Sequence, residues 1–485
     1  IYGNNTEVEF LHISWLFDPT PLVESFSHDG SGEYPRIKHR GTWDLRPHRA
    51  RLVRVDQDVL TQWQQLANES DTPVAQTKLL YPVSTAEQNA IRALAATPAR
   101  LADLAPSITR GLDEKGAKNA GLIRWNTSTP QTWDEVVLRG PQIAIATPIA
   151  KQPPLTTHVD KPVSLVGLPA DAVPSSDYQR SSSLEEFQAA QDLWHGRRYT
   201  TYFRAAWREM IPASTERSLF VGLLPPGPSH IHGMRSMSCT TNLATALTAG
   251  FWAALPLDYA LRISGRGHLD VADARSMPAP APSHPLADPL LLRTLRLNCI
   301  TSAYAPIWEE LFHATWPSYE NWAHAWPGLP ELASQLTPTW DYETPVRTEY
   351  SRRASLVEID ALVSVWLGIS ADELVALYLS RFPQLVDYES QMWFDKKGRR
   401  VASSFNAYGH GQTKEDYLDL LDHLASPNST PPPTGYTAPF YKADREAEMR
   451  ASHAHFQARL DAEIAAGRWS PPEPALTPES APVPE

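Results

Sequence analysis

Arginine side chains gather between residues 197 and 217, where only Glu209 and Glu216 accompany them. A guanidinium group can donate two parallel hydrogen bonds to a guanine edge in the major groove, and it also binds phosphate. A second group follows at 262–268, beside a Gly-x-Gly turn that lets the backbone approach a ligand closely. Both groups predict contact with nucleic acid. The residues concerned are Arg197, Arg198, Arg204, Arg208, Arg217, Arg262, Arg266 and His268.

Lys151 is a further candidate for DNA contact, in a run bounded by Gly140-Pro141 and Pro153-Pro154. Such dipeptides also mark the ends of strands, so a purely structural explanation of the run stays open. A surface ion pair explains each single arginine equally well. The grouping of the arginines is what favours binding.

The most basic window of the chain runs from Arg36 to Arg54, with seven Lys and Arg residues against one acid, Asp44. Each phosphate that a protein neutralises adds affinity for DNA. The window therefore predicts a phosphate-facing strip. A solvated charged surface is the alternative explanation.

Other chemistries have weaker support in the sequence. His230 and His232 have the spacing of two metal ligands on one side of a strand, but no third ligand follows them. Asp395-x-Lys397 has the spacing of part of a nuclease site, although a turn around Gly398 explains these residues equally well. Neither a Ser-His-Asp pattern nor a glycine-rich phosphate loop is found.

Composition limits the class of protein. A formal charge of -12 argues against a protein that coats nucleic acid without specificity, but a local basic groove remains compatible with it. The two cysteines, Cys239 and Cys299, have no CxxC partner, which fits a reducing cytoplasm. No apolar run approaches the roughly 20 residues of a membrane span. We therefore expect a cytoplasmic protein that does not associate with membranes.

The elements that must position these residues follow from periodicity. Alternation from Tyr202 predicts a half-buried strand, and 218–224 predicts a second strand that stops at Pro225. Apolar residues at helical spacing predict a helix over 243–255. Capping patterns predict further helices at 84–104, 356–366, from Ser370 and at 444–466. Residues 133–138 look strand-like, 392–400 predict a hairpin, and 155–195 are expected to form an exposed loop.

The order of these modules resembles the target-recognition domain of type IIG-like adenine-specific DNA methyltransferases and their phage-defence relatives. The resemblance depends on the arginine-bearing strand, on Arg217-Ser218 leading to Pro225-Pro226-Gly227, and on the segments 258–262 and 265–269. The run 138–154 and the block 356–374 add to it. It implies restriction–modification or phage defence, double-stranded DNA as partner, and S-adenosylmethionine as the cofactor of the whole enzyme.

The catalytic half of such an enzyme has no counterpart here. No Asn-Pro-Pro-aromatic or Asp-Pro-Pro-aromatic turn, which would hold a flipped adenine, occurs in the sequence. Phe220-Val221-Gly222 lacks the second glycine of a cofactor loop. We therefore expect no catalytic residue and no cofactor in this chain. Because it begins with Ile1, we expect the methylase motifs to precede it.

The expected fold class is α+β, a mixed α/β recognition domain followed by a mostly helical C-terminal region. The predicted division is 1–110 as the end of a methylase domain, 111–285 as the recognition domain, 286–345 as a Trp-rich connector, 346–470 as a helical domain and 471–485 as a disordered tail. The tryptophans of 286–345 are expected to lie in the core.

Two functions compete. The chain is either the DNA-recognition portion of an adenine methyltransferase, or a separate specificity or scaffold subunit that binds a methylase or a helicase in a defence complex. The second hypothesis places the partner contacts at 300–345 and on the C-terminal helices. A nuclease that uses Asp395 and Lys397 is a third, weaker hypothesis.

Overall fold

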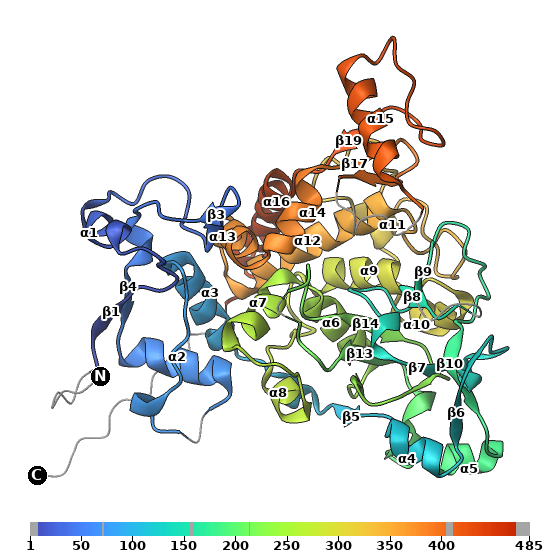
Figure 1. Cartoon of the computed structure of the whole chain (residues 1–485). Coiled ribbons are helices and arrows are strands. Elements are labelled where there is room, and N and C mark those ends of the chain that lie inside the picture. Colours follow the sequence, from blue (N-terminus) through green and yellow to red (C-terminus); the bar gives the residue numbers. More distant parts are fainter. Residues whose placement is uncertain (1–7, 70–71, 155–159, 213, 404–410, 472–485) are drawn as a thin grey trace, which may run out of the picture.

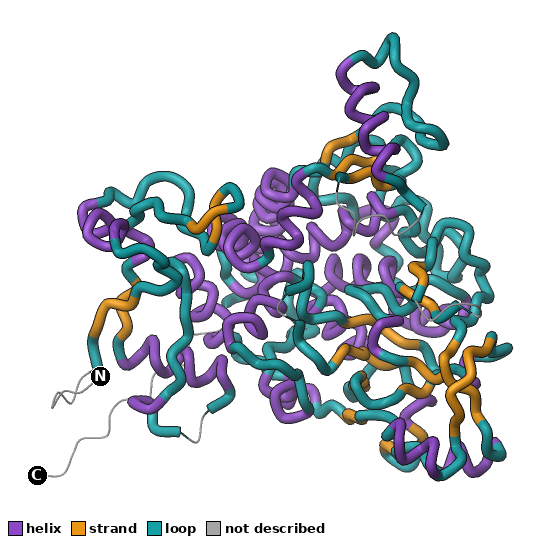
Figure 2. The backbone as a smooth tube through the Cα atoms, viewed as in Figure 1, coloured by secondary structure: helices purple, strands orange, loops and turns teal. Residues whose placement is uncertain are grey.

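The computed structural model describes residues 8–69, 72–154, 160–212, 214–403 and 411–471. It confirms the α+β class, since helices predominate and the strands form several small sheets rather than one large one (Figures 1 and 2). The expected tail falls almost entirely outside the described residues.

A four-stranded antiparallel sheet lies at the centre, in the order β14-β13-β16-β5. Its strand β13 is the predicted arginine-bearing strand, but the prediction that it is half-buried is wrong, because Arg204 and Trp207 are both fully buried. Helix α6 packs on this sheet and helix α9 packs on α6. Gly250 makes that helix contact possible, because a Cβ there would lie 1.8 Å from Thr294 Oγ1. These elements are β5 (Ser107–Thr109), β13 (Arg204–Arg208), β14 (Val221–Leu224), β16 (Met234–Ser238), α6 (Asn242–Trp252) and α9 (Ala287–Asn298).

A layer of helices covers α6 and α9, and local capping defines its ends. Gly368 ends α12 in the left-handed conformation, with φ of +75°. Ser370 then caps α13 in a reciprocal box with Glu373, as predicted. Asp444 caps α16, which packs along α12. The helices of this layer are α7 (Leu255–Ser264), α12 (Glu349–Leu367), α13 (Ala371–Arg381), α14 (Pro383–Ser390) and α16 (Arg445–Ala465).

Residues 8–104 form an N-terminal lobe, at the left of Figure 1. Ser84 caps α3 as predicted, but the helix ends at Ala96, short of the expected Leu104. Glu87 of α3 holds Arg381 of α13 at 2.6 Å and so fastens the lobe to the helical layer. The lobe contains β1 (Phe10–His12), α1 (Thr20–Ser27), β2 (Lys38–His39), β3 (Thr42–Trp43), β4 (Val53–Val55), α2 (Gln57–Ala67) and α3 (Thr85–Ala96).

A second lobe, here called the ribbon lobe, comprises residues 107–154 and 160–202 and extends from the right to the lower right of Figure 1. Ile123, Tyr178 and Phe187 form a small core of their own there. The prediction of an exposed loop over 155–195 is wrong, because strand β10 lies in this range and pairs with β6. The lobe contains α4 (Glu114–Asn119), β6 (Ile123–Ser128), β7 (Val137–Leu138), β8 (Lys151–Gln152), β9 (Lys161–Pro162), β10 (Ser176–Arg180), α5 (Leu184–Ala189), β11 (Leu193–Trp194) and β12 (Arg197–Arg198).

The remaining elements connect these parts. The predicted hairpin at 392–400 is present as β17 and β18, while residues 133–135 are a 3-10 turn rather than a strand. Strand β15 extends the ribbon lobe by a parallel pair with β7. The elements are β15 (Ser229–His230), α8 (Val271–Ser276), α10 (Ala305–Leu311), α11 (Trp316–Tyr319), β17 (Met392–Phe394), β18 (Arg400–Ala402), α15 (Lys414–Ala425) and β19 (Tyr441–Lys442).

One cluster of buried apolar side chains includes residues from Val53 to Leu460. It therefore crosses the predicted domain boundaries after residues 110, 285 and 345. The predicted division into domains stays a prediction. Trp308, Trp316 and Trp326 are buried in this cluster, so the Trp-rich segment is core, as expected. Within the described ranges, no helix is both long and apolar enough to serve as a membrane span.

A buried ionic network joins the loop before β14 to the helical layer. Asp258 of α7 forms ion pairs with Arg217 at 2.8 Å and with Arg262 at 3.1 Å. Asp360 of α12 receives Arg445 of α16 at 2.6 Å. The network continues through Glu389, which binds both Arg445 and Arg353, and Arg353 also reaches Glu448. Its four guanidinium groups and four carboxylates balance in charge, which is what lets them stay inside.

Loss of the Glu389 carboxylate should destabilise the fold, because it pairs with two buried arginines. Burial alone would raise the pKa of Glu389, but the charges of Arg353 and Arg445 lower it to about 2. Glu389→Gln leaves two buried cations facing a neutral amide. We expect it to lower the free energy of unfolding by about 3–5 kcal/mol at pH 7, measured by urea denaturation.

The control for this experiment is Asp372→Asn, which breaks the solvent-exposed Asp372–Arg450 pair. It should cost less than about 1 kcal/mol. Equal, small losses for the two variants would contradict a stabilising role for the network.

Candidate nucleic-acid interface

Arg204 lies in the interior, although the sequence predicted that it contacts DNA. Its Nη2 donates to the carbonyls of Pro228 at 2.6 Å and Pro225 at 3.4 Å, and the guanidinium lies 5.0 Å from the centre of the Tyr199 ring. Burial lowers its pKa to about 10. Arg204 therefore fixes the Pro-Pro-Gly turn after β14, and the prediction of DNA contact is corrected.

Arg217 and Arg262 are also structural. Both bind Asp258, and Asp258 further accepts the backbone N–H groups of Ser218 and Leu219 at 2.8 and 3.2 Å. Arg262 also donates to the carbonyls of Arg381 and Thr215. These side chains hold the loop before β14 against α7. The expectation that they face a duplex is wrong in this fold.

Arg208 bridges β13 to the turn at Gly140-Pro141. Its Nε donates to the Ile143 carbonyl at 2.9 Å, and its guanidinium covers the Phe220 ring at 4.0 Å. Burial lowers its pKa to about 10. It too serves packing, so its predicted role at DNA is corrected.

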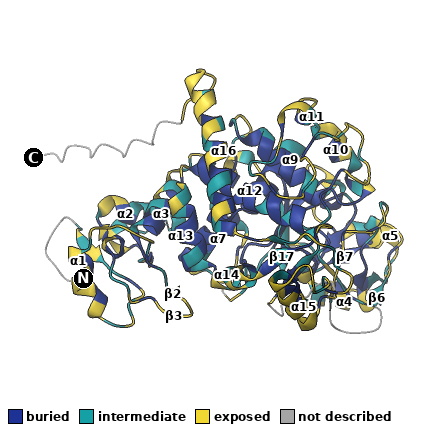
Figure 3. Ribbon diagram, turned by 90° about the horizontal axis from the view of Figure 1, so that it is seen from above, coloured by how far each residue is buried: buried dark blue, intermediate teal, exposed yellow. Residues whose placement is uncertain are grey.

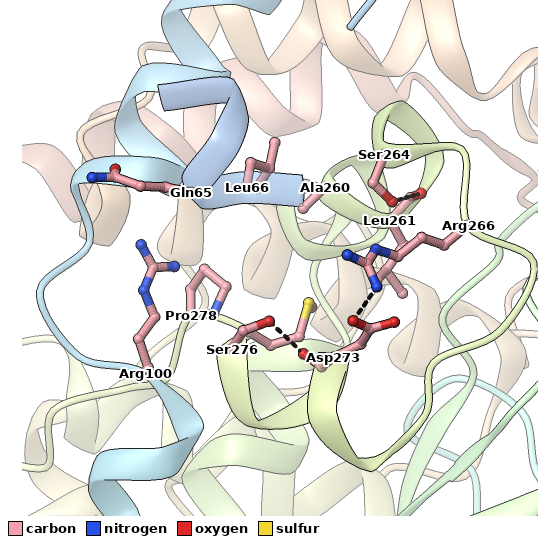
Figure 4. Close-up of a pocket in the computed structure, with 11 residues that line it drawn as sticks. Gln65, Leu66, Arg100, Ala260, Leu261, Ser264, Arg266, Asp273, Ser276 and Pro278 are labelled. Carbon is pink, nitrogen blue, oxygen red and sulfur yellow. Dashed lines mark hydrogen bonds and ion pairs between the residues drawn. The ribbon is translucent and has the colours of Figure 1, made fainter. Parts of the chain in front are cut away.

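Arg266 lies in a pit between α2, α7 and α8 (Figure 4). It pairs with Asp273 and donates to the carbonyl of Ala67 at the end of α2. Arg100, on the other side of the pit, donates to the carbonyl of Ala95 at the end of α3. The free volume is about 20 Å³, close to that of one water molecule. Arg266 is thus a helix-end cap rather than part of a ligand site.

The other predicted residues are accessible. Arg197 and Arg198 are an exposed and a half-buried residue of β12, in a hairpin whose turn places His195 and Gly196 at positive φ. Arg197 lies 5.1 Å from the centre of the Tyr202 ring. Lys151 is exposed on β8. His268 is exposed on the loop between α7 and α8, where its backbone bridges to Met210. The nine predicted residues therefore do not form one surface.

The ribbon of β6 and β10 carries polar residues that the sequence interpretation missed. Arg124 donates to Gln179 Oε1 through Nε at 3.1 Å and Nη2 at 2.6 Å, and Asn126 Nδ2 donates to the same oxygen at 3.0 Å. Trp125, which is 54% exposed, meets the Tyr178 ring edge-on at 5.0 Å. The alternation of apolar and polar residues from Ile123 to Asn126 indicates a strand, but its partner β10 falls in the range predicted to be a loop.

Two contacts join the small β8–β9 hairpin to this ribbon. Gln152 accepts the N–H and hydroxyl of Ser175, both at 2.9 Å, immediately before β10. Arg139 pairs with Asp160 beside β9 and with Asp177 on β10. Lys151 and Lys161, on neighbouring strands of the hairpin, are both exposed. The ribbon and the hairpin therefore form one continuous region with outward-facing cations.

The alternative sites have other roles. His230 is fully buried, its Nε2 lies 2.8 Å from Ser236 Oγ, and His232 Nδ1 accepts the Glu114 N–H at 3.2 Å. In the described part of the chain, no group of three metal-ligating side chains occurs. Asp395 is buried and organises its hairpin turn by accepting the N–H groups of Lys397 and Arg399. These positions support neither a metal centre nor a nuclease.

The basic window at 36–54 is only partly available. Asp44 forms ion pairs with Arg46 at 2.9 Å and with Arg51 at 3.5 Å. Glu33 pairs with Arg36 at 2.8 Å. Arg54 pairs with Glu9 at the surface. Exposed side chains without such a pair among the described residues are Lys38, Arg40 and Arg49.

Comparison with known proteins adds no assignment. No protein-family model matches the chain, and no curated protein matches it. The site must be interpreted from its own geometry.

His230 should make the free energy of unfolding depend on pH. Burial, with a smaller contribution from Arg204, lowers its pKa to about 3. An unfolded histidine titrates near 6.5, so between about pH 6.5 and 3 the unfolded chain binds a proton that folded His230 does not. The free energy of unfolding should therefore fall by about 2 kcal/mol between pH 6 and pH 4.5 through this residue. In His230→Gln that part of the pH dependence should disappear in denaturation experiments.

The matched control is His195→Gln, at the exposed tip of the β11–β12 hairpin. It should keep the pH dependence of the wild type. The same steepness in all three proteins would show that His230 does not stay neutral in the folded chain.

Proposed function

We propose that this chain is the DNA-binding and sequence-recognition portion of a site-specific adenine DNA methyltransferase. The observation that carries the proposal is the β6–β10 ribbon with the β8–β9 hairpin joined to it, where Arg124, Lys151 and Lys161 are exposed. Arg197 is exposed as well, on the β11–β12 hairpin of the same lobe. The resemblance in module order around β13 and β14 supplies the enzyme class. The arginines inside those modules support the fold rather than the contact.

A two-stranded ribbon has the size that DNA recognition requires. The major groove is about 12 Å wide and admits either a helix or a two-stranded β-ribbon. Cations on hairpins beside the ribbon would meet the phosphates that border the groove, since such contacts set register and orientation. A net charge of -12 over the whole chain confines favourable contact to such local regions.

Catalysis belongs elsewhere in this proposal. S-adenosylmethionine and the turn that holds the adenine would be supplied by a methylase domain outside these 485 residues. This chain would hold the duplex and select the sequence, within a restriction–modification or phage-defence system.

The proposal predicts salt-dependent binding to duplex DNA. Binding should weaken steeply between 50 and 200 mM salt, measured by fluorescence anisotropy with labelled duplexes. A variant with alanine at Lys151, Lys161, Arg197 and Arg198 should bind more weakly at low salt. The slope of log K against log salt should become shallower by about 0.9 for each lost phosphate contact.

The matched control removes exposed lysines far from the ribbon, with alanine at Lys396, Lys397 and Lys414. Lys414 begins α15, at the top of Figure 1 and away from β6. This variant should keep the wild-type slope. A wild-type chain that binds no duplex, or identical slopes for both variants, would refute the proposal.

A second function has its own support in the N-terminal lobe. Helix α1 buries Pro21 and Ser25 but exposes Leu22, Val23 and Phe26, the reverse of an ordinary surface helix (Figure 3). Apolar side chains gathered at a surface mark protein contacts. Nine large exposed apolar residues occur in this lobe: Leu11, Trp15, Phe17, Leu22, Val23, Phe26, Trp43, Leu45 and Tyr81. The lobe therefore favours a subunit that binds another protein, through a surface other than the predicted 300–345 segment. In this second function, the partner we propose is a separate methylase or a helicase.

This second function predicts a partner that depends on α1. Affinity purification of the tagged chain from its source cells should recover a methylase or a helicase identified by mass spectrometry. Val23→Asp with Phe26→Asp should abolish the recovery without changing the thermal midpoint by more than a few degrees, because both side chains are exposed. Leu418→Asp with Leu421→Asp, exposed on α15, is the control. Recovery that survives the α1 changes would exclude this surface.

A further inference from the structure

We infer that Arg124, Asn126 and Gln179 form a base-reading element specific for duplex DNA, which recognises a guanine and an adenine within about three base pairs. The inference rests on the DNA-binding function proposed above. It goes further, because it names the side chains that would distinguish one sequence from another.

The two faces of the β6–β10 ribbon differ in character. Tyr178 and Ile123 lie on the face that packs with Phe187 of α5. Arg124 stands directly opposite Gln179 in the strand register, and their hydrogen bonds show that both lie on the other face. Asn126 joins them there. The polar cluster therefore occupies the solvent side of a ribbon whose inner side is anchored by its own core.

The hydrogen bonds within this cluster fix which groups point outward. Gln179 Oε1 accepts from Arg124 Nε, Arg124 Nη2 and Asn126 Nδ2, so this oxygen is saturated. Arg124 Nη1, Gln179 Nε2 and Asn126 Oδ1 have no hydrogen-bond partner among the described residues, and Arg124 Nη2 and Asn126 Nδ2 each keep a second N–H. The cluster holds three long side chains in one arrangement and leaves donors and an acceptor for a ligand.

Those groups match the edges of bases in the major groove. An arginine reads guanine through O6 and N7, and an asparagine or glutamine reads adenine through N7 and the N6 amine. Residues two apart on a strand are separated by about 6.6 Å. That is close to two base-pair steps of about 3.4 Å. Arg124 and Asn126 can therefore address two base pairs that are separated by one.

The cluster is not needed to hold the ribbon together. The strands are joined by their backbone ladder and by the Tyr178 and Ile123 packing on the opposite face. The three side chains of the cluster are exposed or half-buried. Substitutions within it should leave the fold intact, which makes their effect on recognition interpretable.

The test is selection from a random duplex pool, followed by affinity measurements on the enriched sequence and on single-base variants of it. Wild-type protein should enrich a site that contains a guanine and an adenine. Arg124→Ala should lose discrimination at the guanine by about tenfold or more, and Asn126→Ala at the adenine by a similar factor. On unrelated duplexes, the affinity of Asn126→Ala should stay within about twofold of the wild type. The affinity of Arg124→Ala for unrelated duplexes should fall modestly.

Arg180→Ala is the matched control, since Arg180 belongs to the same ribbon but donates to the Ser182 carbonyl. It should keep the wild-type sequence preference. Circular dichroism and thermal midpoints verify that all variants are folded.

The outcomes separate the inference from the function on which it rests. A wild-type protein that binds no duplex overturns both. Binding without any sequence preference, or a preference that Arg124→Ala and Asn126→Ala leave unchanged, overturns the inference and leaves DNA binding standing.

Discussion

Charge balance among buried side chains determines how the helical layer packs on the central sheet. Asp258 and Asp360 are completely buried, and each needs guanidinium partners, which Arg217 and Arg445 provide. Burial still raises the pKa of Asp360 despite these charges, which shows how strongly the interior opposes an unpaired carboxylate. Because the partners come from α7, α12, α16 and the loop before β14, none of these elements can shift alone. The central sheet and the helices above it are thereby fixed in one arrangement.

This constraint also explains why local signals in the sequence predicted the elements better than the site. The Ser370 cap, the Gly368 terminus and the extended conformation of β13 depend on residues close together in the sequence, and all three are present, although β13 is buried on both faces rather than half-buried. The partner of Arg217 is 41 residues away. Nothing local tells an arginine that meets Asp258 in the core from one that meets a phosphate. The pairing of β10 could not be predicted from local signals either, because its partner strand lies about 50 residues earlier.

The arginines of this chain consequently divide into two groups that look alike in sequence. Arg204, Arg208 and Arg262 donate to backbone carbonyls or buried carboxylates, and burial lowers the pKa of each. They stabilise the turn after β14, the contact of β13 with the Ile143 carbonyl, and helix α7. Arg124 and Arg197 belong to strands at the periphery, where water competes for every hydrogen bond. The arginines around β13 and β14 therefore support the fold, while Arg124 and Arg197 remain accessible on strands at the periphery.

The way the ribbon lobe is attached fits this division between structural and accessible arginines. Its inner face has a separate small core, so the polar face need not contribute to folding. Its attachment to the platform is through backbone pairing, because β15 pairs with β7 and β5 pairs with β16 of the central sheet. His230 lies on β15, and its hydrogen bond to Ser236 joins that attachment to β16. The ribbon lobe is thereby attached to the central sheet through strand pairing, and the strand register sets the order of the side chains along its exposed face.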